Sequence, residues 1–316
     1  MGPGDKRLRV LAVVGPTATG KSALAIALAQ ALRGEVVACD STAVYRRFDI
    51  GTDKVPPEEQ RGVPHHLVDV VDPAEAYSAA QYAKDALAAI EDITRRGRVP
   101  ILAGGTGLYY RALTRGIFPG PGRDEALRAR LVRISERRGV RWLHRMLDRV
   151  DPASARRVQP RDLKRIVRAL EVYFLTGTPL TSHFDRTVSP LAGFEVASIA
   201  LRIAPESTAE RVARRVDQQF ARGVVREVKD ILASGVPETA HPFTGLVYRQ
   251  VLELLRGQRD EAATRALVLR ENRRYARRQL IWFRKEPNLH WLSTPGEDRA
   301  TLDAADAALG AWRTMR

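Results

Sequence analysis

Short apolar runs alternate with helical patterns along the first hundred residues. Residues 10–14, 35–39 and 99–103 are apolar runs that end in turn-forming or polar residues, as buried strands do. Helical patterns occupy residues 22–32 and 79–95, and the second of these carries apolar side chains at positions i, i+3 and i+4. Strands that alternate with helices predict βαβ units, so the fold class is α/β with a mostly parallel sheet.

The pattern changes near residue 118. Residues 118–125, FPGPGRDE, are rich in proline and glycine and mark a boundary. A helical, arginine-rich pattern then continues to about Leu175, and strand character returns at residues 194–203. A helical insertion between two strands of the core is the simplest interpretation. The predicted domains are residues 1–117 and 192–316 for the core and residues 118–191 for the insertion.

The rest of the chain is predicted to be helical, over residues 207–234, 247–256 and 259–285. No apolar stretch approaches the roughly 20 residues that span a bilayer, so no membrane partner is expected. The single cysteine, Cys39, excludes an intramolecular disulfide and a zinc finger and fits a reducing cytoplasm. We therefore expect a cytoplasmic protein, and a monomer.

The formal net charge of +15 is concentrated in the insertion. Between Arg123 and Arg168, fifteen Arg and Lys residues face six Asp and Glu residues, a net charge of +9 that leaves +6 for the rest of the chain. A basic module of this kind indicates a nucleic-acid partner.

Arginines recur at helical spacing in two regions. In the insertion the spacing predicts amphipathic helices with one basic face, and residues 270–278 repeat the theme. The alternative is an ordinary solvated helix surface. Trp282 and Phe283 are expected in the core rather than stacked on bases. The recurring arginines are Arg133, Arg137, Arg141, Arg145 and Arg149 in the insertion and Arg270, Arg273, Arg274, Arg277 and Arg278 near the C-terminus.

Residues 15–22, GPTATGKS, match the phosphate-binding pattern G-x-x-x-x-G-K-S between a predicted strand and a predicted helix. Its glycines let backbone N–H groups converge on phosphate oxygens, Lys21 adds a positive charge, and Ser22 is a candidate Mg²⁺ ligand. Thr17 and Thr19 either hold the shape of the loop or touch the ligand. The predicted phosphate-binding residues are Gly15, Pro16, Thr17, Ala18, Thr19, Gly20, Lys21 and Ser22.

An acid follows the second predicted strand rather than the third. An NTP hydrolase usually has a carboxylate after a later strand, but the strand at 99–103 leads into the turn GGTG at residues 104–107. Asp40 instead ends the strand EVVACD, facing the ligand crevice, where it would accept a proton or hold Mg²⁺ through water. The alternative role of Asp40 is to cap the next turn.

Two further features are open or structural. The turn at residues 104–107 is either a structural turn or a point of close substrate approach. His65 and His66 lack partners at metal-ligand spacing and are predicted to be structural.

The serial order of motifs from about Val10 to Trp291 resembles the tRNA dimethylallyltransferases. The matching motifs are GPTATGKS, DSTAVYRRFDIGTDK, PHHLVDVVDP, AYSAAQYAKDA, PILAGGTGLYYRAL, RALEVY and RRYARRQLIWFRK. The resemblance implies a P-loop NTPase-like core and transfer of a dimethylallyl group from dimethylallyl diphosphate to N6 of adenosine 37 in tRNA. It also implies that the loop holds a diphosphate with Mg²⁺ and that no nucleotide is hydrolysed.

The same resemblance implies roles for individual residues. Asp40 would be the general base on the N6 amine, and Arg215 would act in diphosphate binding and catalysis together with Lys21. Ala43 and Val247 depart from the family pattern, which usually has Gln and Gly there. The implied tRNA contacts are Asp40, Ser41, Thr42, Ala43, Thr106, Arg128, Lys164, Arg165, Ile166, Val167 and Arg168.

Three other functions share part of this sequence pattern. A small-molecule kinase uses the same loop but leaves the basic insertion without a role, as does a prenyltransferase acting on free adenine nucleotides. An RNA-binding protein switched by a nucleoside triphosphate is disfavoured because the third strand lacks a following acid.

Overall fold

The computed structural model describes residues 8–118, 120–310 and 312, and it divides into two compact units. The first unit comprises Met1–Thr114 and Pro190–Arg316, and the second comprises Arg115–Ser189. These divisions fall three residues before the predicted boundary at 117 and two residues before the one at 191. Each unit has its own cluster of buried apolar side chains.

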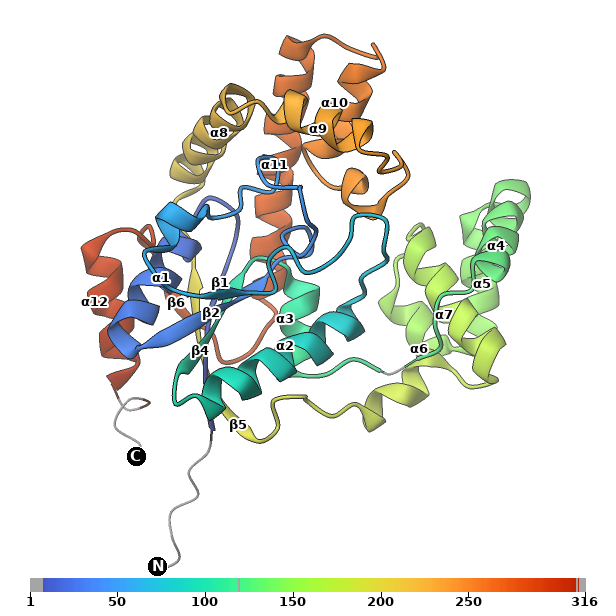
Figure 1. Ribbon diagram of the computed structural model, residues 1–316. Helices are drawn as coiled ribbons and strands as arrows, with labels where there is room; N and C mark the ends of the chain where they lie inside the picture. Colours follow the sequence, from blue (N-terminus) through green and yellow to red (C-terminus); the bar gives the residue numbers. More distant parts are fainter. Residues whose placement is uncertain (1–7, 119, 311, 313–316) are drawn as a thin grey trace, which may run out of the picture. The chain divides into compact units, whose positions relative to one another are not determined.

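A parallel sheet forms the centre of the first unit (Figure 1). Within the described residues it has six strands in the order β3-β2-β4-β1-β5-β6, and all neighbouring strands are parallel. The predicted α/β fold with a mostly parallel sheet is confirmed. The strands are β1 (Leu8–Val14), β2 (Gly34–Cys39), β3 (His65–His66), β4 (Val99–Gly104), β5 (Phe194–Leu201) and β6 (His290–Leu292).

The structure after residue 207 differs from the predicted helical ranges in two places. The first is β6, which has only three residues, so it is too short to show a strand period, and it pairs with β5 through Trp291 and Ala200. The second is Gly223, whose left-handed φ of 91° separates two helices where one was predicted over residues 207–234.

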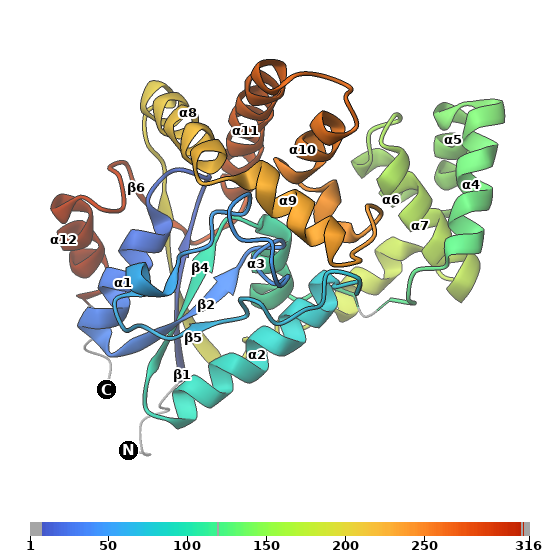
Figure 2. The same ribbon diagram turned by 45° about the horizontal axis from the view of Figure 1, so that its top comes forward.

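Helices cover both faces of the sheet (Figures 1 and 2). Side chains of α1 and α12 pack on one face, and side chains of α2 and α3 pack on the other. The helices of the first unit are α1 (Lys21–Leu32), α2 (Ala79–Arg95), α3 (Gly107–Thr114), α8 (Pro205–Ala221), α9 (Val224–Ala233), α10 (Tyr248–Leu255), α11 (Glu261–Phe283) and α12 (Arg299–Ala308), with short 3₁₀ turns at Pro57–Gln60 and His241–Thr244.

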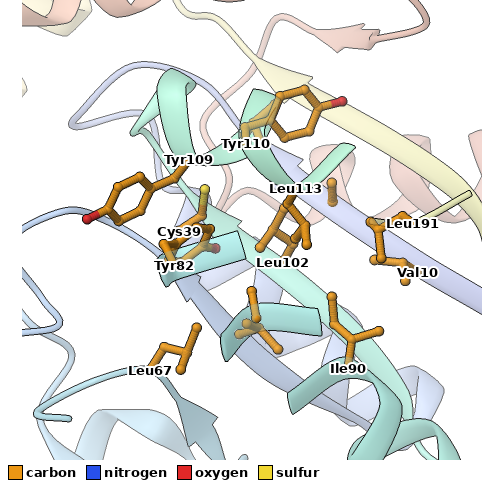
Figure 3. Packing of buried hydrophobic residues seen from close by; sticks show 14 of the residues in the cluster. Val10, Cys39, Leu67, Tyr82, Ile90, Leu102, Tyr109, Tyr110, Leu113 and Leu191 are labelled. Atoms are coloured by element: carbon orange, nitrogen blue, oxygen red, sulfur yellow. The ribbon is translucent and has the colours of Figure 1, made fainter. Parts of the chain in front are cut away.

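The central strand β1 is buried on both faces. Val10, Ala12 and Val14 face the cluster beneath α2 and α3, while Leu11 and Val13 face the cluster beneath α1 and α12. This explains why β1 reads as a continuous apolar run rather than an alternating one. Figure 3 shows the first cluster, in which the rings of Tyr82 and Tyr109 stack with their centroids 4.1 Å apart.

Helices α8–α11 gather beyond the carboxyl ends of the strands (Figures 1 and 2). Their apolar faces bury a third cluster together with Val44, Tyr45 and Phe48 from the chain that follows β2. The carboxyl ends of parallel strands are where ligands bind in such sheets, so these helices build part of the candidate site.

The insertion is a small helical unit. Leu131, Leu143, Leu147 and Leu170 are at most 2% exposed and form its core, while the five arginines at 133, 137, 141, 145 and 149 are exposed, as the amphipathic pattern predicts. No described helix of either unit has the length and apolarity to cross a membrane. The helices of the insertion are α4 (Glu125–Arg138), α5 (Val140–Val150), α6 (Pro152–Arg157) and α7 (Leu163–Thr176), followed by a 3₁₀ segment at Leu180–Arg186.

Candidate active site

A cavity of about 510 Å³ opens at the carboxyl ends of β1, β2 and β4. The phosphate loop, the turn after β2, the turn after β4 and helices α8, α10 and α11 contribute to its wall. Residues from six distant parts of the chain therefore meet in one place. The lining residues used below are Thr17, Lys21, Ser22, Asp40, Ser41, Thr42, Ala43, Thr52, Asp53, His65, Gly105, Arg215, Val247, Tyr275 and Gln279.

The phosphate loop is held in shape by its own threonine and lysine. Gly15 has φ 137°, and a Cβ there would lie 2.5 Å from the Leu201 carbonyl oxygen, so only glycine fits. The Thr19 hydroxyl is buried and donates to the Pro16 carbonyl oxygen at 2.9 Å. Lys21 Nζ donates to the same oxygen at 2.6 Å. Thr19 and Lys21 thus both help to fix the shape of the loop.

Lys21 is a half-buried cation that lines the cavity. Burial and the charge of Arg215 lower its pKa to about 8, while the carboxylate of Asp40 acts in the opposite direction. An anion bound in the loop would stabilise the charged ammonium.

Arg215 reaches the loop from α8. One of its terminal nitrogens donates to Thr17 Oγ1 at 2.7 Å and the other donates to the Thr52 carbonyl oxygen at 3.1 Å. Its Nε lies 3.2 Å from a carboxylate oxygen of Asp53. The guanidinium is therefore fixed beside the phosphate loop.

Asp40 both caps a turn and lines the cavity. Its Oδ1 accepts hydrogen bonds from Thr42 N at 2.8 Å, Thr42 Oγ1 at 2.7 Å and Ala43 N at 3.3 Å. Among the described residues, its Oδ2 has no hydrogen-bond partner. The two roles considered from the sequence are compatible, since one oxygen holds the carboxylate in place and the other remains able to accept a proton.

The turn after β4 is tied to Asp40 through its neighbour. Thr106 Oγ1 accepts a hydrogen bond from Ser41 N at 3.1 Å, and Thr106 N donates to the Cys39 carbonyl oxygen at 3.2 Å. A Cβ on Gly105 or Gly107 would run into Gln279 or Trp282 of α11. Packing of α11 accounts for these glycines, which supports the structural interpretation of the turn.

Both histidines belong to β3, and His65 Nδ1 lies 2.9 Å from the Val63 carbonyl oxygen. His66 Nε2 lies 2.7 Å from Glu35 Oε2, in agreement with a structural role, whereas His65 lines the cavity. Burial lowers the pKa of His65, which favours its neutral form. No group of three His, Cys, Asp or Glu side chains positioned to hold a metal occurs among the described residues.

Comparison with known proteins places this chain in a family. The IPP transferase family model matches residues 43–286. A tRNA dimethylallyltransferase of Solibacter usitatus is 45% identical over 287 residues, which cover 91% of this chain and 93% of the relative. One from Koribacter versatilis is 42% identical over 93% of this chain and 95% of the relative.

The chain belongs to the IPP transferase family.

Solved structures of similar proteins share the fold. The tRNA isopentenylpyrophosphate transferase of Bacillus halodurans has a TM-score of 0.71 and 34% identity, with 97% of this chain and 98% of that chain covered. A eukaryotic dimethylallyltransferase acting on tRNA has a TM-score of 0.76 and 27% identity, covering 97% of this chain and 79% of the other.

Val247, which departs from the usual glycine of the IPP transferase family, keeps a glycine-like backbone. Its φ is 72° and its ψ is −60°, a strained conformation for a β-branched residue, and its side chain is 1% exposed. The departure therefore costs local strain at the start of α10. Ala43, the other departure, is 7% exposed and lines the cavity.

The insertion residues implied to contact tRNA fall into two groups. Lys164 and Arg165 are exposed. Ile166 and Val167 are 0% and 4% exposed, because they lie on the face of α7 that packs into the core. Ile166 and Val167 therefore present almost no side-chain surface to a partner, and the tRNA contacts over residues 164–168 stay a prediction.

Arg128 and Arg168 share one buried carboxylate. Glu171 is fully buried and accepts hydrogen bonds from Arg128 Nε at 2.7 Å and from an Arg168 terminal nitrogen at 2.7 Å. Burial raises the pKa of Glu171, but these bonds and that from Asp124 N outweigh it and lower the pKa to about 2. Both arginines thus have a structural role inside the insertion.

The sequence analysis did not identify Tyr275 and Gln279 of α11 as site residues. Both line the cavity, and Gln279 is only 7% exposed. Gln279 stands with Val268, Ala276 and Phe283 on the buried side of α11. The same side of α11 also carries the buried polar residues Thr264 and Asn272, so the pattern of apolar and polar positions does not single out Gln279.

Proposed function

We propose that this chain transfers the dimethylallyl group of dimethylallyl diphosphate to N6 of adenosine 37 in tRNA and releases diphosphate. The observation that carries the proposal is the single cavity in which the phosphate loop, Lys21 and Arg215 meet Asp40. The names of the relatives agree with it, since they are tRNA dimethylallyltransferases.

In the proposed reaction, Asp40 accepts the proton and the phosphate-loop side of the cavity stabilises the leaving diphosphate. N6 forms a bond to C1 of the dimethylallyl group while the bond from C1 to the diphosphate oxygen breaks. The N6 proton passes to Oδ2 of Asp40, whose other oxygen is held by Thr42. Lys21, Arg215 and the loop N–H groups would stabilise the charge that develops on the leaving diphosphate.

Mg²⁺ is proposed as the cofactor. The Ser22 hydroxyl lies at the start of α1 and lines the same cavity as the Asp40 carboxylate. Mg²⁺ is usually bound by one or two protein oxygens, by substrate phosphates and by water. The Ser22 hydroxyl and the Asp40 carboxylate fit this set of ligands. When bound, the ion would neutralise part of the diphosphate charge.

RNA binding is proposed for the exposed basic faces of the insertion and of α11. Ser41, Thr42, Ala43 and Thr106 lie at or beside the cavity, where the target nucleoside would have to enter as an unstacked base. Because tRNA is the proposed acceptor, we expect the enzyme to work in the cytoplasm. We also propose that it works as a monomer.

One experiment tests the proposal directly. Unmodified tRNA is incubated with dimethylallyl diphosphate, Mg²⁺ and the protein, digested to nucleosides and analysed by mass. We expect N6-(dimethylallyl)adenosine to appear without any requirement for ATP. Stoichiometric release of ADP with a small hydroxylated acceptor, and no modified adenosine, would favour a kinase instead.

A further inference from the structure

Gln279 joins the phosphate loop to the turn after β4, two elements that follow neighbouring strands of the sheet. Its Oε1 accepts a hydrogen bond from Thr17 N of the phosphate loop at 2.8 Å. Its Nε2 donates to the carbonyl oxygen of Gly105, in the turn after β4, at 2.9 Å. One side chain of α11 therefore bridges the ends of β1 and β4.

The bridge is buried and tightly enclosed. Gln279 is 7% exposed and Thr17 is 8% exposed, so water does not compete freely for these groups. A Cβ on Gly105 would collide with Nε2 of Gln279 and would lie 3.2 Å from the Gly15 carbonyl oxygen. A primary amide matches the site because it offers one acceptor and one donor at the same distance from the helix.

At the phosphate loop, where dimethylallyl diphosphate would bind, the bridge formed by Gln279 connects to Arg215. Thr17 gives its N–H to Gln279 and receives the Arg215 hydrogen bond on Oγ1 at 2.7 Å. The N–H and the hydroxyl oxygen of Thr17 thus have partners within the protein, while its hydroxyl proton can still be donated to a ligand in the cavity. The other groups available for phosphate binding are the following N–H groups of the loop, Lys21 and Arg215.

At the Asp40 end of the cavity, where the target nucleoside would bind, the bridge formed by Gln279 lies beside Tyr275. Burial and the charge of Asp40 raise the pKa of Tyr275 to about 12, and hydrogen bonds with the Thr106 and Gln279 side chains oppose that rise. Thr106 in turn accepts from Ser41 N, next to Asp40. Polar contacts thus run from Arg215 through Gln279 to the residue adjoining Asp40.

We propose that Gln279 is a positioning residue that fixes the spacing between the phosphate loop and the Asp40 end of the cavity. The inference rests on the proposed function. Without the two hydrogen bonds of Gln279, dimethylallyl diphosphate and tRNA still bind to their main groups. The reacting C1 and N6 atoms, however, are no longer held in alignment. A misplacement of about 1 Å costs on the order of 10²-fold in rate.

Gln279→Met tests this, because methionine has a similar length but forms neither hydrogen bond. The expected result is a fall of about 10²-fold in the single-turnover rate of transfer, with the Kd values for tRNA and inorganic diphosphate changed by less than about threefold. Thr264→Val is the matched control, since Thr264 is also fully buried on α11 and its hydroxyl donates to Asp260 of the same helix. This control should retain the wild-type rate.

Gln279→Glu supplies a second test that does not depend on the folding of the methionine variant. An ionised carboxylate accepts from Thr17 N but cannot donate to Gly105 O, whereas a protonated carboxyl group does both. Burial raises the pKa of a carboxyl group at this 7% exposed position, so the rate relative to wild type should recover as the pH is lowered toward that pKa, while the relative rate of Gln279→Met stays flat.

The possible outcomes separate the two proposals. Transfer by the wild-type protein with an unchanged rate in Gln279→Met would overturn the positioning role alone. Loss of diphosphate binding in parallel with the rate would also overturn it, since Gln279 would then be part of the donor site. Absence of transfer by the wild-type protein would overturn both proposals.

Discussion

The phosphate loop and the helical insertion both concentrate positive charge, but they hold it in different ways. Lys21 and Arg215 are tied by hydrogen bonds to the loop beside them, and burial lowers the pKa of Lys21. Arg137 and Arg141 of the insertion are exposed to solvent. Fixed, partly buried cations suit charge that develops at one point, whereas exposed cations suit a long polyanion whose attraction is screened by salt.

The comparison predicts that the residues of the cavity determine the transfer rate and that the insertion determines tRNA affinity. Asp40→Asn should give the largest effect on the rate. Asparagine keeps an oxygen for Thr42 and Ala43 but cannot accept the proton, so the single-turnover rate should fall by about 10²–10⁴-fold. Binding of tRNA and of inorganic diphosphate should be retained. A near-normal transfer rate would reduce Asp40 to the cap of its turn.

Lys21→Ala should give the next largest effect. Removing a fixed cation from the developing diphosphate charge should lower kcat/KM for dimethylallyl diphosphate by about 10²–10³-fold. Steady-state kinetics with tRNA saturating measures this loss. Affinity for tRNA should stay within about twofold of wild type, and an equal loss there would break the distinction between the two regions.

The fold was predictable where local signals are strong. β1, β2 and β4 are buried apolar runs and were found, and α2 ends where its periodic pattern ends. The three-residue strand β6 has no such pattern. Its place depends on pairing with β5, which is distant in sequence.

The site was predictable only as far as its motifs reach. The loop and Asp40 follow strand ends, so chain order alone places them at one edge of the sheet. The bond between Thr17 and Gln279 joins residues 262 positions apart, and only the folded chain brings them together. Likewise, the positive charge of the insertion is visible in the sequence, but the pairing of Arg128 with Glu171 depends on how α4 packs on α7.

Charge reversal in the insertion should act on affinity rather than on chemistry. The double variant Arg137→Glu, Arg141→Glu should weaken tRNA binding by about 10–30-fold near physiological salt and lower the slope of log K against log[salt] by about 1.4–1.8. The single-turnover rate at saturating tRNA should be unchanged. Titrations at several salt concentrations measure both quantities.

A matched control distinguishes local contacts from net charge. Arg95 and Arg98 are also exposed, at the end of α2 and just before β4, at the amino end of the sheet. Arg95→Glu, Arg98→Glu changes the net charge by the same amount away from the cavity. A similar loss of slope in this control would mean that the insertion acts only through the overall charge of the protein.

The smallest expected effect is a pH dependence that belongs to the loop alone. The pKa of Lys21 is lowered to about 8 by burial and by Arg215, and a bound diphosphate favours the protonated form. Diphosphate binding is therefore strongest below pH 8, and the Kd for inorganic diphosphate should rise by up to about tenfold between pH 7 and pH 9 as Lys21 loses its proton.

Lys21→Arg remains charged throughout, so it corrects for ionisation of the ligand itself, and its curve of Kd against pH should rise less than that of wild type. Binding of tRNA should show no matching change, because the insertion arginines keep their charge over this range. Parallel curves for the wild type and Lys21→Arg would mean that Lys21 stays protonated in the free enzyme, and the electrostatic contrast between loop and insertion would then rest on hydrogen bonding alone.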